Sequence, residues 1–266
     1  MHQSTLRNLQ SGFSLAEAAM VLAVMAVVIG ALVPSFLSIR VAEQVRATSQ
    51  NLKTVMNTIA GFVQSSGCVP CPVPAERAYD ISAHGNVAGG DGIKLCGGCT
   101  RAVGLLPFRS LGLPESLAKD AYGHWLTYAV DITLAGYIPT LPNIQPVADK
   151  GLCSVTFASA NPVHVTLSNS SPQNNIAVLL LSHGANGYGA YKNQPGSSND
   201  RLPFPSASPA CSGLTGAERC NSTLTPSYVM ATPAQGSDPF DDVYFYLDRN
   251  ALVTYLSNPA CATGWP

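Results

Sequence analysis

The 266-residue sequence predicts an α+β fold, with one long N-terminal α-helix packed on a mainly antiparallel β-sheet that carries long, disulfide-stapled loops. Two observations predict it. An apolar run near the N-terminus passes directly into apolar residues at helical spacing. The remaining chain, about two hundred residues and enough for one core, alternates short β-prone segments with frequent proline and glycine.

The N-terminal helix is predicted over residues 13–66. Its first half contains the run Ala18–Leu37, interrupted only by one proline and one serine. At about 1.5 Å per residue this run is long enough to cross a hydrocarbon core of about 30 Å. Further apolar residues follow at helical spacing, at Val41, Val45, Leu52, Val55, Ile59 and Phe62. We therefore expect a membrane-spanning first half, and a second half whose apolar face packs on a soluble domain of residues 67–266.

Short segments rich in β-branched or aromatic residues predict the strands. They are Trp125–Val130, Cys153–Ala158, Val163–Leu167, Ile176–Ser182 and Val243–Leu247. The segment Pro195–Ser237 is rich in proline, glycine and serine and is predicted to be an extended loop region. It contains at most one short strand, Tyr228–Ala231. Loops of this length tend to be either functional or poorly ordered.

A single carboxylate, Glu17, stands at the start of the apolar run. The polar segment before it, residues 1–12, ends at Gly12, and no A-x-A-like cleavage site follows the run as in a secretory signal peptide. We therefore expect a leader of residues 1–12 and a cut after Gly12, which makes Phe13 the new N-terminus. An acid within a membrane is costly and calls for a partner, although a place among the lipid headgroups is the simpler alternative for Glu17.

The segment "GFSLAE", from Gly12 to Glu17, followed by an apolar helix, resembles the N-terminus of type IV prepilins and type II secretion pseudopilins. The resemblance implies that a prepilin peptidase cuts after Gly12 and methylates Phe13. It also implies that Glu17 pairs with the N-terminal amine of a neighbouring subunit during filament assembly, and that Pro34 loosens the helix. The implied partners are other pilin or pseudopilin subunits, an inner-membrane assembly platform and membrane lipid.

Three further segments, "GCVPCPVPA", "VGLLPFRSLGLPESLAKDAYGHWLTYAVD" and "LLLSHGANGYGAY", resemble parts of large minor-pilin-like proteins. The resemblance implies a single-pass protein of the bacterial inner membrane, with its soluble domain in the periplasm or on an extracellular filament. A bulky head is hard to repeat along a thin filament, which favours a non-enzymatic minor or tip subunit of a type IV pilus or type II secretion pseudopilus. The alternative is an exported, disulfide-stapled enzyme or binding domain that uses the prepilin signal only as an anchor.

The charge of the chain excludes one class of partner. The net charge is −1 and only 11% of the residues are charged. Binding to nucleic acid depends on Lys and Arg clusters that neutralise phosphates. We therefore expect no nucleic-acid partner.

All eight cysteines follow the apolar run. They are Cys68, Cys71, Cys96, Cys99, Cys153, Cys211, Cys220 and Cys261. Their even number and their placement predict disulfides formed in an oxidising compartment, with Cys211 and Cys220 stapling the long loop and Cys153 and Cys261 left for each other. The first four form two C-x-x-C motifs, which are also typical of a zinc site or, less so here, of a thioredoxin-like redox site.

Other catalytic or metal-binding patterns are weak. The sequence lacks G-x-S-x-G, H-E-x-x-H and P-loop motifs, and the S-x-x-K match at Ser116–Lys119 lacks its companion K-T-G. His183 lies in a glycine-rich turn and is expected to find its partners locally. Calcium could use the oxygens of three nearby acids, but without EF-hand spacing a capped turn is the better interpretation, and we expect no metal or cofactor. The acids are Asp238, Asp241 and Asp242.

Overall fold

The computed structural model describes residues 14–66, 69–75, 99, 101–132, 134, 163–167, 172–193, 200–206, 208–236, 238–248 and 251–252. For residues 31–38 and 174 it describes the backbone but not the side chains. Several predictions fall outside these residues. They concern the leader of residues 1–12, Phe13, the side chain of Pro34, the strand Cys153–Ala158, and the cysteines Cys68, Cys96, Cys153 and Cys261.

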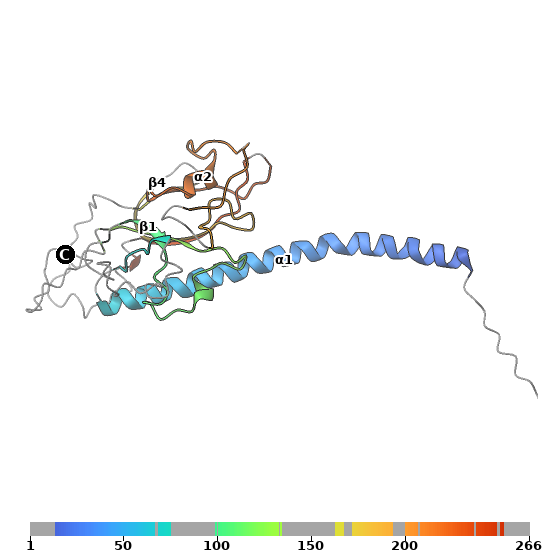
Figure 1. Cartoon of the computed structure of the whole chain (residues 1–266), viewed down its shortest axis with the longest axis horizontal. Coiled ribbons are helices and arrows are strands. Elements are labelled where there is room, and N and C mark those ends of the chain that lie inside the picture. Colours follow the sequence, from blue (N-terminus) through green and yellow to red (C-terminus); the bar gives the residue numbers. More distant parts are fainter. Residues whose placement is uncertain are drawn as a thin grey trace, which may run out of the picture. The chain divides into compact units, whose positions relative to one another are not determined.

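The long N-terminal helix, α1, extends from Leu15 to Ser66 and is drawn in blue to cyan in Figure 1. The internal contacts divide the chain into two units, Met1–Gln44 and Val45–Pro266, and α1 has residues in both. The predicted helix of residues 13–66 is thus confirmed from Leu15 onward.

The part of α1 in the first unit exposes its apolar side chains. The large ones are Leu15, Met20, Val21, Leu22, Val24, Met25, Val27, Val28, Ile29, Ile39 and Val41. Among the residues searched, which are those the structure describes, no helical segment has both the length and the apolar character needed to cross a membrane.

The part of α1 in the second unit buries one face in the core. Leu52, Val55 and Ile59 are fully buried, as the apolar spacing predicted, and Met56 and Val63 complete the stripe. Two other predicted members are wrong. Val41 and Val45 are exposed, because burial along this face begins only at Thr48, whose hydroxyl accepts a hydrogen bond from the amide of Ala121.

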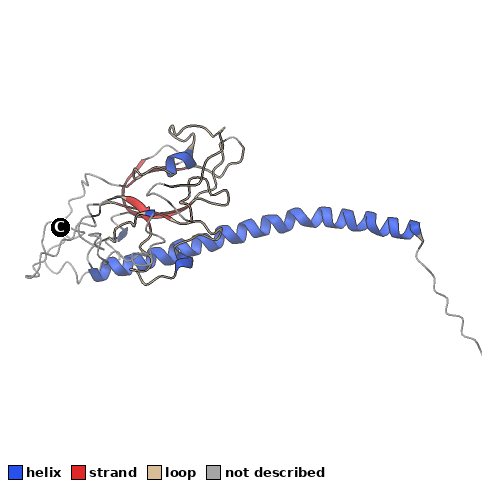
Figure 2. Ribbon diagram, viewed as in Figure 1, coloured by secondary structure: helices blue, strands red, loops and turns tan. Residues whose placement is uncertain are grey.

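One six-stranded sheet forms the body of the second unit (Figure 2). Its strands are β1 (Val103–Leu105), β2 (Thr127–Val130), β3 (Val163–Leu167), β4 (Pro172–Ser182), β5 (Ser227–Met230) and β6 (Val243–Asp248). The order is β1-β2-β4-β3-β5, and β6 also pairs with β4. All pairs are antiparallel except β3 with β5, so the prediction of a mainly antiparallel sheet is confirmed.

The predicted strand positions agree closely with the structure where it describes them. The strands predicted at Val163–Leu167, Ile176–Ser182 and Val243–Leu247 correspond to β3, β4 and β6, and the short strand in the long loop corresponds to β5. The first predicted strand begins later, at Thr127. Strand β1, the 3-10 helix Glu115–Leu117 and the helix α2 (Ala217–Asn221) were not predicted.

Strand β4 lies at the centre of the core because its side chains are buried on both faces of the sheet. Val178 and Leu180 belong to the cluster that includes the buried face of α1, whereas Leu179 and Leu181 belong to a second cluster. This alternation follows from the two-residue period of a strand. The continuous apolar sequence of β4 is therefore the pattern of a strand covered on both sides.

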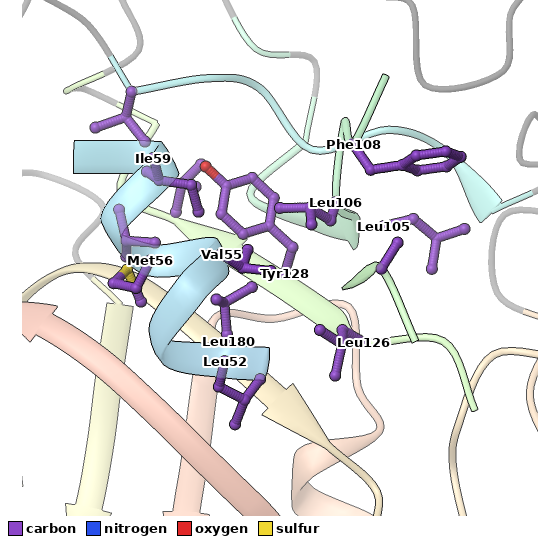
Figure 3. Close-up of a cluster of buried hydrophobic side chains, with 14 of the residues drawn as sticks. Leu52, Val55, Met56, Ile59, Leu105, Leu106, Phe108, Leu126, Tyr128 and Leu180 are labelled. Atoms are coloured by element: carbon purple, nitrogen blue, oxygen red, sulfur yellow. The ribbon is translucent and has the colours of Figure 1, made fainter. Parts of the chain in front are cut away.

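Figure 3 shows how α1 meets the first face of the sheet. Leu52, Val55 and Ile59 of α1 surround Tyr128 of β2, together with side chains that follow β1. The hydroxyl of Tyr128 is buried and donates a hydrogen bond of 2.9 Å to the carbonyl of Pro70. This bond fixes the segment that leaves α1 against the sheet and satisfies a buried polar group.

Truncating Leu52 is expected to test this packing. The side chain is 0% exposed, so Leu52→Ala leaves a cavity and should lower the free energy of unfolding by about 2–5 kcal/mol. Leu224→Ala is the matched control because Leu224 is 45% exposed and should change stability by less than about 0.5 kcal/mol. Urea unfolding followed by circular dichroism measures both. Equal midpoints for Leu52→Ala and the wild type would contradict the placement of α1 in the core.

Candidate functional site

The start of α1 is held by a reciprocal pair of hydrogen bonds between Ser14 and Glu17. The amide of Ser14 donates to Glu17 Oε2 at 3.0 Å, and the amide of Glu17 donates to Ser14 Oγ at 3.2 Å. This S-x-x-E arrangement is a capping box, which satisfies two amides at a helix N-terminus. The carboxylate also lies where the helix dipole favours negative charge. Glu17 therefore has a local partner that the sequence interpretation did not consider, although that partner carries no charge.

The other predicted positions of this segment are not tested by the structure. Gly12 and Phe13 precede the first described residue. Helix α1 continues through residue 34, but the side chain of Pro34 lies outside the description, so its effect on the helix stays a prediction.

Disulfides were predicted in the soluble domain, and two are present among the residues that the structure describes. Cys71 bonds to Cys99 across 28 residues, and Cys211 bonds to Cys220 across nine. The second is the predicted staple of the long loop. The first joins one C-x-x-C motif to the other. Its two sulfurs are therefore not free thiolates that could bind zinc, and neither is paired with the other cysteine of its own motif. For these two cysteines the zinc and thioredoxin-like alternatives are wrong.

Three acids of the described residues, Glu218, Asp241 and Asp242, lie close together and form what we call the buried acid cluster. One carboxylate oxygen from each acid lies within 4.8 Å of the other two. Glu218 lies in α2, whereas Asp241 and Asp242 directly precede β6. The glycine turn after β4 lies beside the start of β6 because Ser182 pairs with Val243. The cluster therefore joins three segments that are distant in sequence.

Each acid of the cluster has one oxygen held by an amide group. Glu218 Oε1 accepts from Asn186 Nδ2 at 2.8 Å and from the amide of Asp241 at 3.0 Å. Asp241 Oδ2 accepts from the amide of Asn186 at 3.0 Å, and Asp242 Oδ2 accepts from Asn221 Nδ2 at 2.7 Å. The second oxygen of each acid, namely Glu218 Oε2, Asp241 Oδ1 and Asp242 Oδ1, is buried without a hydrogen-bond partner.

The described residues around the cluster provide no positively charged partner for its acids. Within the described parts of the chain, no Lys or Arg forms an ion pair with any of the three acids. His183 faces the cluster, with Nδ1 3.9 Å from Asp242 Oδ1 and without a hydrogen-bond partner of good geometry. Burial lowers the pKa of His183 well below its usual value, and the nearby Arg201 and His124 add to this effect. His183 is therefore neutral near pH 7 and supplies no counter-charge.

The pKa values of Glu218 and Asp242 are raised in this buried environment. Burial raises the pKa of Glu218 to about 7, although the hydrogen bonds that it accepts from the Asn186 side chain and the Asp241 backbone amide oppose the rise. Burial also raises the pKa of Asp242 well above its usual range. The cause in both cases is the cost of placing a charge in a medium of low dielectric. Glu218 and Asp242 therefore carry a negative charge less readily than exposed carboxylates do.

Gly184 leaves room beside the cluster that another residue would fill. It adopts a left-handed conformation, with φ of 59°, and a Cβ at this position would come within 2.1 Å of Asp241 Oδ1. Only glycine therefore lets the turn after β4 approach the carboxylate so closely. The interpretation of this segment as a strand that ends in a glycine turn is confirmed.

Three interpretations of these residues need correction. His183 is not held by its own turn alone, because its Nε2 lies 2.9 Å from Thr127 Oγ1 of another strand. Asp241 and Asp242 do not cap their own turn but join the glycine turn and α2. Only Asp238 acts as a cap, and it does so at a distance, by accepting hydrogen bonds of 3.1 and 3.2 Å from the amide of Gly216 at the start of α2.

Lys119, the lysine of the S-x-x-K match, has two partners close by. Lys119 Nζ donates a hydrogen bond of 2.7 Å to Glu115 Oε1 and lies 4.4 Å from the ring centroid of Trp125. A lysine fixed by an acid and an aromatic ring is a structural cation. These contacts account for Lys119 without a catalytic serine.

Sequence reasoning did not find Glu218 as a member of the cluster. It lies 23 residues from Asp241, in a helix of five residues within a region predicted to be a loop. The adjacent pair Asp241 and Asp242 before a strand was the one available signal.

Comparison of the chain with protein-family models, curated proteins and solved structures finds no match.

Proposed function

We propose that this chain is a non-enzymatic minor subunit of a type IV pilus or type II secretion pseudopilus, placed at or near the tip. On this proposal the chain is cut after Gly12, methylated at Phe13, held in the bacterial inner membrane by its apolar helix and extracted into a filament by the assembly platform. The Val45–Pro266 unit then lies in the periplasm or on the filament surface.

The observation that carries the proposal is the exposed apolar surface of α1 in the first unit. Its side chains from Leu15 to Ile29 include nine large hydrophobic residues that are exposed in the single chain. A surface of this size requires lipid or other protein around it. The proposed occupants are membrane lipid before assembly and the equivalent helices of neighbouring subunits afterwards.

The sequence of the helix start supports the same proposal. The capping box of Ser14 and Glu17 lies directly after the proposed cut, so the new N-terminal amine of Phe13 would be close to a carboxylate in every copy. An ion pair between Glu17 of one copy and the amine of the next would be strong in low dielectric and would fix the stagger between helices. The disulfides fit the proposed export into an oxidising compartment.

An exported enzyme or binding domain is the second candidate, and a fragment distinguishes the two. A fragment that begins at Gly67 would be a poor choice, because it lacks the part of α1 that supplies Leu52, Val55 and Ile59 to the core. A fragment that begins at Val45 keeps this face and coincides with the second unit.

We expect the Val45–Pro266 fragment, exported with a cleavable signal, to fold but to be absent from filaments that contain the full chain. Circular dichroism and urea unfolding check its fold, and immunoblotting of sheared filaments checks its incorporation. Incorporation of the fragment at the level of the full chain would refute assembly through the N-terminal helix. Enzymatic turnover retained by the fragment would favour the second candidate.

A further inference from the structure

We propose that a small pocket beside α2 binds a lysine side chain presented by a partner protein, with Asp238 as the acceptor for its ammonium group. The walls of this pocket come from the loop that precedes α2, from α2 itself and from the segment between β5 and β6. The inference goes beyond the proposed function and does not depend on it, because it names a class of partner for the second unit whether or not the chain enters a filament.

The pocket is mainly apolar, and small side chains create its space. Ala217, Ala231 and Ala234 each contribute only a methyl group, whereas Leu214 and Phe240 form larger apolar walls. The volume is about 220 Å³, which exceeds the roughly 10–15 Å³ that one water needs but is below the roughly 300–1,000 Å³ of sites for drug-sized ligands. This size suits a single side chain better than a larger organic molecule.

Asp238 supplies the charged group among the described residues that line the pocket, and it decides the charge of the occupant. Its two oxygens accept hydrogen bonds of 3.1 and 3.2 Å from one neutral donor, the amide of Gly216. Within the described parts of the chain, no Lys or Arg forms an ion pair with it. A carboxylate beside an apolar pocket is complemented by an occupant with an apolar body and a positive end.

Lysine fits this arrangement better than arginine. Its stem of four methylene groups is apolar and can lie along the walls while the charged end reaches the carboxylate. Arginine prefers to bind a carboxylate through two parallel hydrogen bonds, but the amide of Gly216 already occupies the side that both oxygens of Asp238 share. An ammonium acts as a point charge and needs only one oxygen. The hydroxyl of Thr232, which also lines the pocket, provides a second acceptor.

The walls of the pocket are held in place by contacts within the chain. The turn that carries Leu214 is closed by two backbone hydrogen bonds of 3.0 Å between Ser212 and Thr215, and a disulfide closes the surrounding loop. On the opposite wall, Ala234 and Phe240 exchange two backbone hydrogen bonds of 3.0 Å. A pocket that is formed before binding saves the entropic cost of ordering its walls.

The rim of the pocket indicates that the lysine belongs to a protein. Residues 232–236 form one side of this rim, and all five are exposed and uncharged. An extended protein segment can lie across such a rim without meeting a buried charge and can place one side chain in the pocket. Protein interfaces commonly anchor a side chain in a pocket in this way, with weaker contacts around it.

The test uses the full chain in detergent and saturation-transfer NMR, which observes the signals of the peptide. Three blocked tripeptides serve as probes, each with one variable residue between two glycines. The variable residues are lysine, arginine and norleucine, which keeps an apolar stem of four carbons without the charge. We expect the lysine peptide to bind about fivefold more tightly than the norleucine peptide, with the strongest saturation on its stem methylenes.

Three results would contradict this expectation. The absence of saturation transfer to the lysine peptide would overturn the proposal. Equal or tighter binding of the norleucine peptide would overturn the role of Asp238. Tighter binding of the arginine peptide would contradict the choice of lysine.

Substitutions test the position of the site. Asp238→Asn removes the charge but keeps an oxygen that can accept from the amide of Gly216, so it should lower the affinity for the lysine peptide by about fivefold. Ala234→Leu adds bulk to the lining at an exposed position and should lower this affinity by about tenfold or more. Gln235→Leu is the matched control, because it adds the same side chain at the next exposed residue, outside the lining, and should bind as the wild type does.

Circular dichroism checks that each variant is folded. Unchanged affinity in folded Ala234→Leu, or an equal loss in Gln235→Leu, would overturn the assignment of the pocket. If Asp238→Asn does not fold, the comparison of Ala234→Leu with Gln235→Leu still decides, because both positions are exposed.

Discussion

Replacing Glu17 with alanine is expected to lower incorporation into filaments by about a hundredfold or more, while membrane insertion and leader removal continue. If Glu17 pairs with the amine of a neighbouring Phe13, the substitution leaves that amine buried and unpaired. Removing one partner of a buried ion pair costs about 3–5 kcal/mol, and every 1.4 kcal/mol corresponds to about a factor of ten. Insertion should not suffer, because the substitution removes a charge near the membrane.

The capping box provides the matched variants that separate charge from helix capping. Glu17→Gln keeps a side chain that can complete a capping box but removes the charge, whereas Ser14→Ala keeps the charge and removes the hydroxyl that accepts from the Glu17 amide. The loss of the cap costs only about 1 kcal/mol. We expect Glu17→Gln to fail in assembly as Glu17→Ala does, and Ser14→Ala to assemble within about tenfold of the wild type.

Pull-down of each variant with sheared filaments, beside an assay for leader removal, measures these effects. Wild-type incorporation of Glu17→Gln together with a loss in Ser14→Ala would mean that Glu17 serves only to cap the helix. Wild-type incorporation of Glu17→Ala would mean that it is an interfacial residue without a role in assembly.

The second large effect concerns the cut after Gly12. We expect the intact mass of the membrane-extracted protein to correspond to a chain that begins at Phe13 and carries one added methyl group. Gly12→Val should lower the cleaved fraction by about tenfold or more, because a β-branched side chain restricts the backbone at the bond to be cut and hinders the approach of the peptidase.

Ser11→Ala is the control for this change, since it alters the adjacent leader residue and keeps the glycine. It should be processed as the wild type is. A mature chain that begins at Met1, or after a site beyond Leu37, would contradict the predicted processing, as would unchanged cleavage of Gly12→Val.

Elements that depend on neighbouring residues in the chain could be predicted from the sequence. The strand at Val163–Leu167 agrees with β3 residue for residue, because its β-branched residues stand between turn-forming segments. Strand β1 was not predicted because it has only three residues, and Gly104 weakens its β-pattern. That glycine is needed in the folded chain, since a Cβ there would come within 2.4 Å of the carbonyl of Val73.

Features that depend on tertiary contacts could not be predicted. Nothing in the sequence near Asp242 indicates that its oxygens face His183 and Asn221, which β4 and α2 bring to it. The buried face of α1 was predicted in its periodicity but not in its extent, because the position where the sheet begins to cover the helix depends on the fold. The pairing of Cys71 with Cys99 likewise requires the path of the chain.

The presence of the chain in filaments tests the proposed function most directly. Filaments sheared from cells that produce the protein naturally should contain, after purification and mass spectrometry, a peptide that begins at methylated Phe13, at low stoichiometry relative to the main subunit. Filaments that lack the chain, while its processed form is abundant in the membrane of the same cells, would contradict the account.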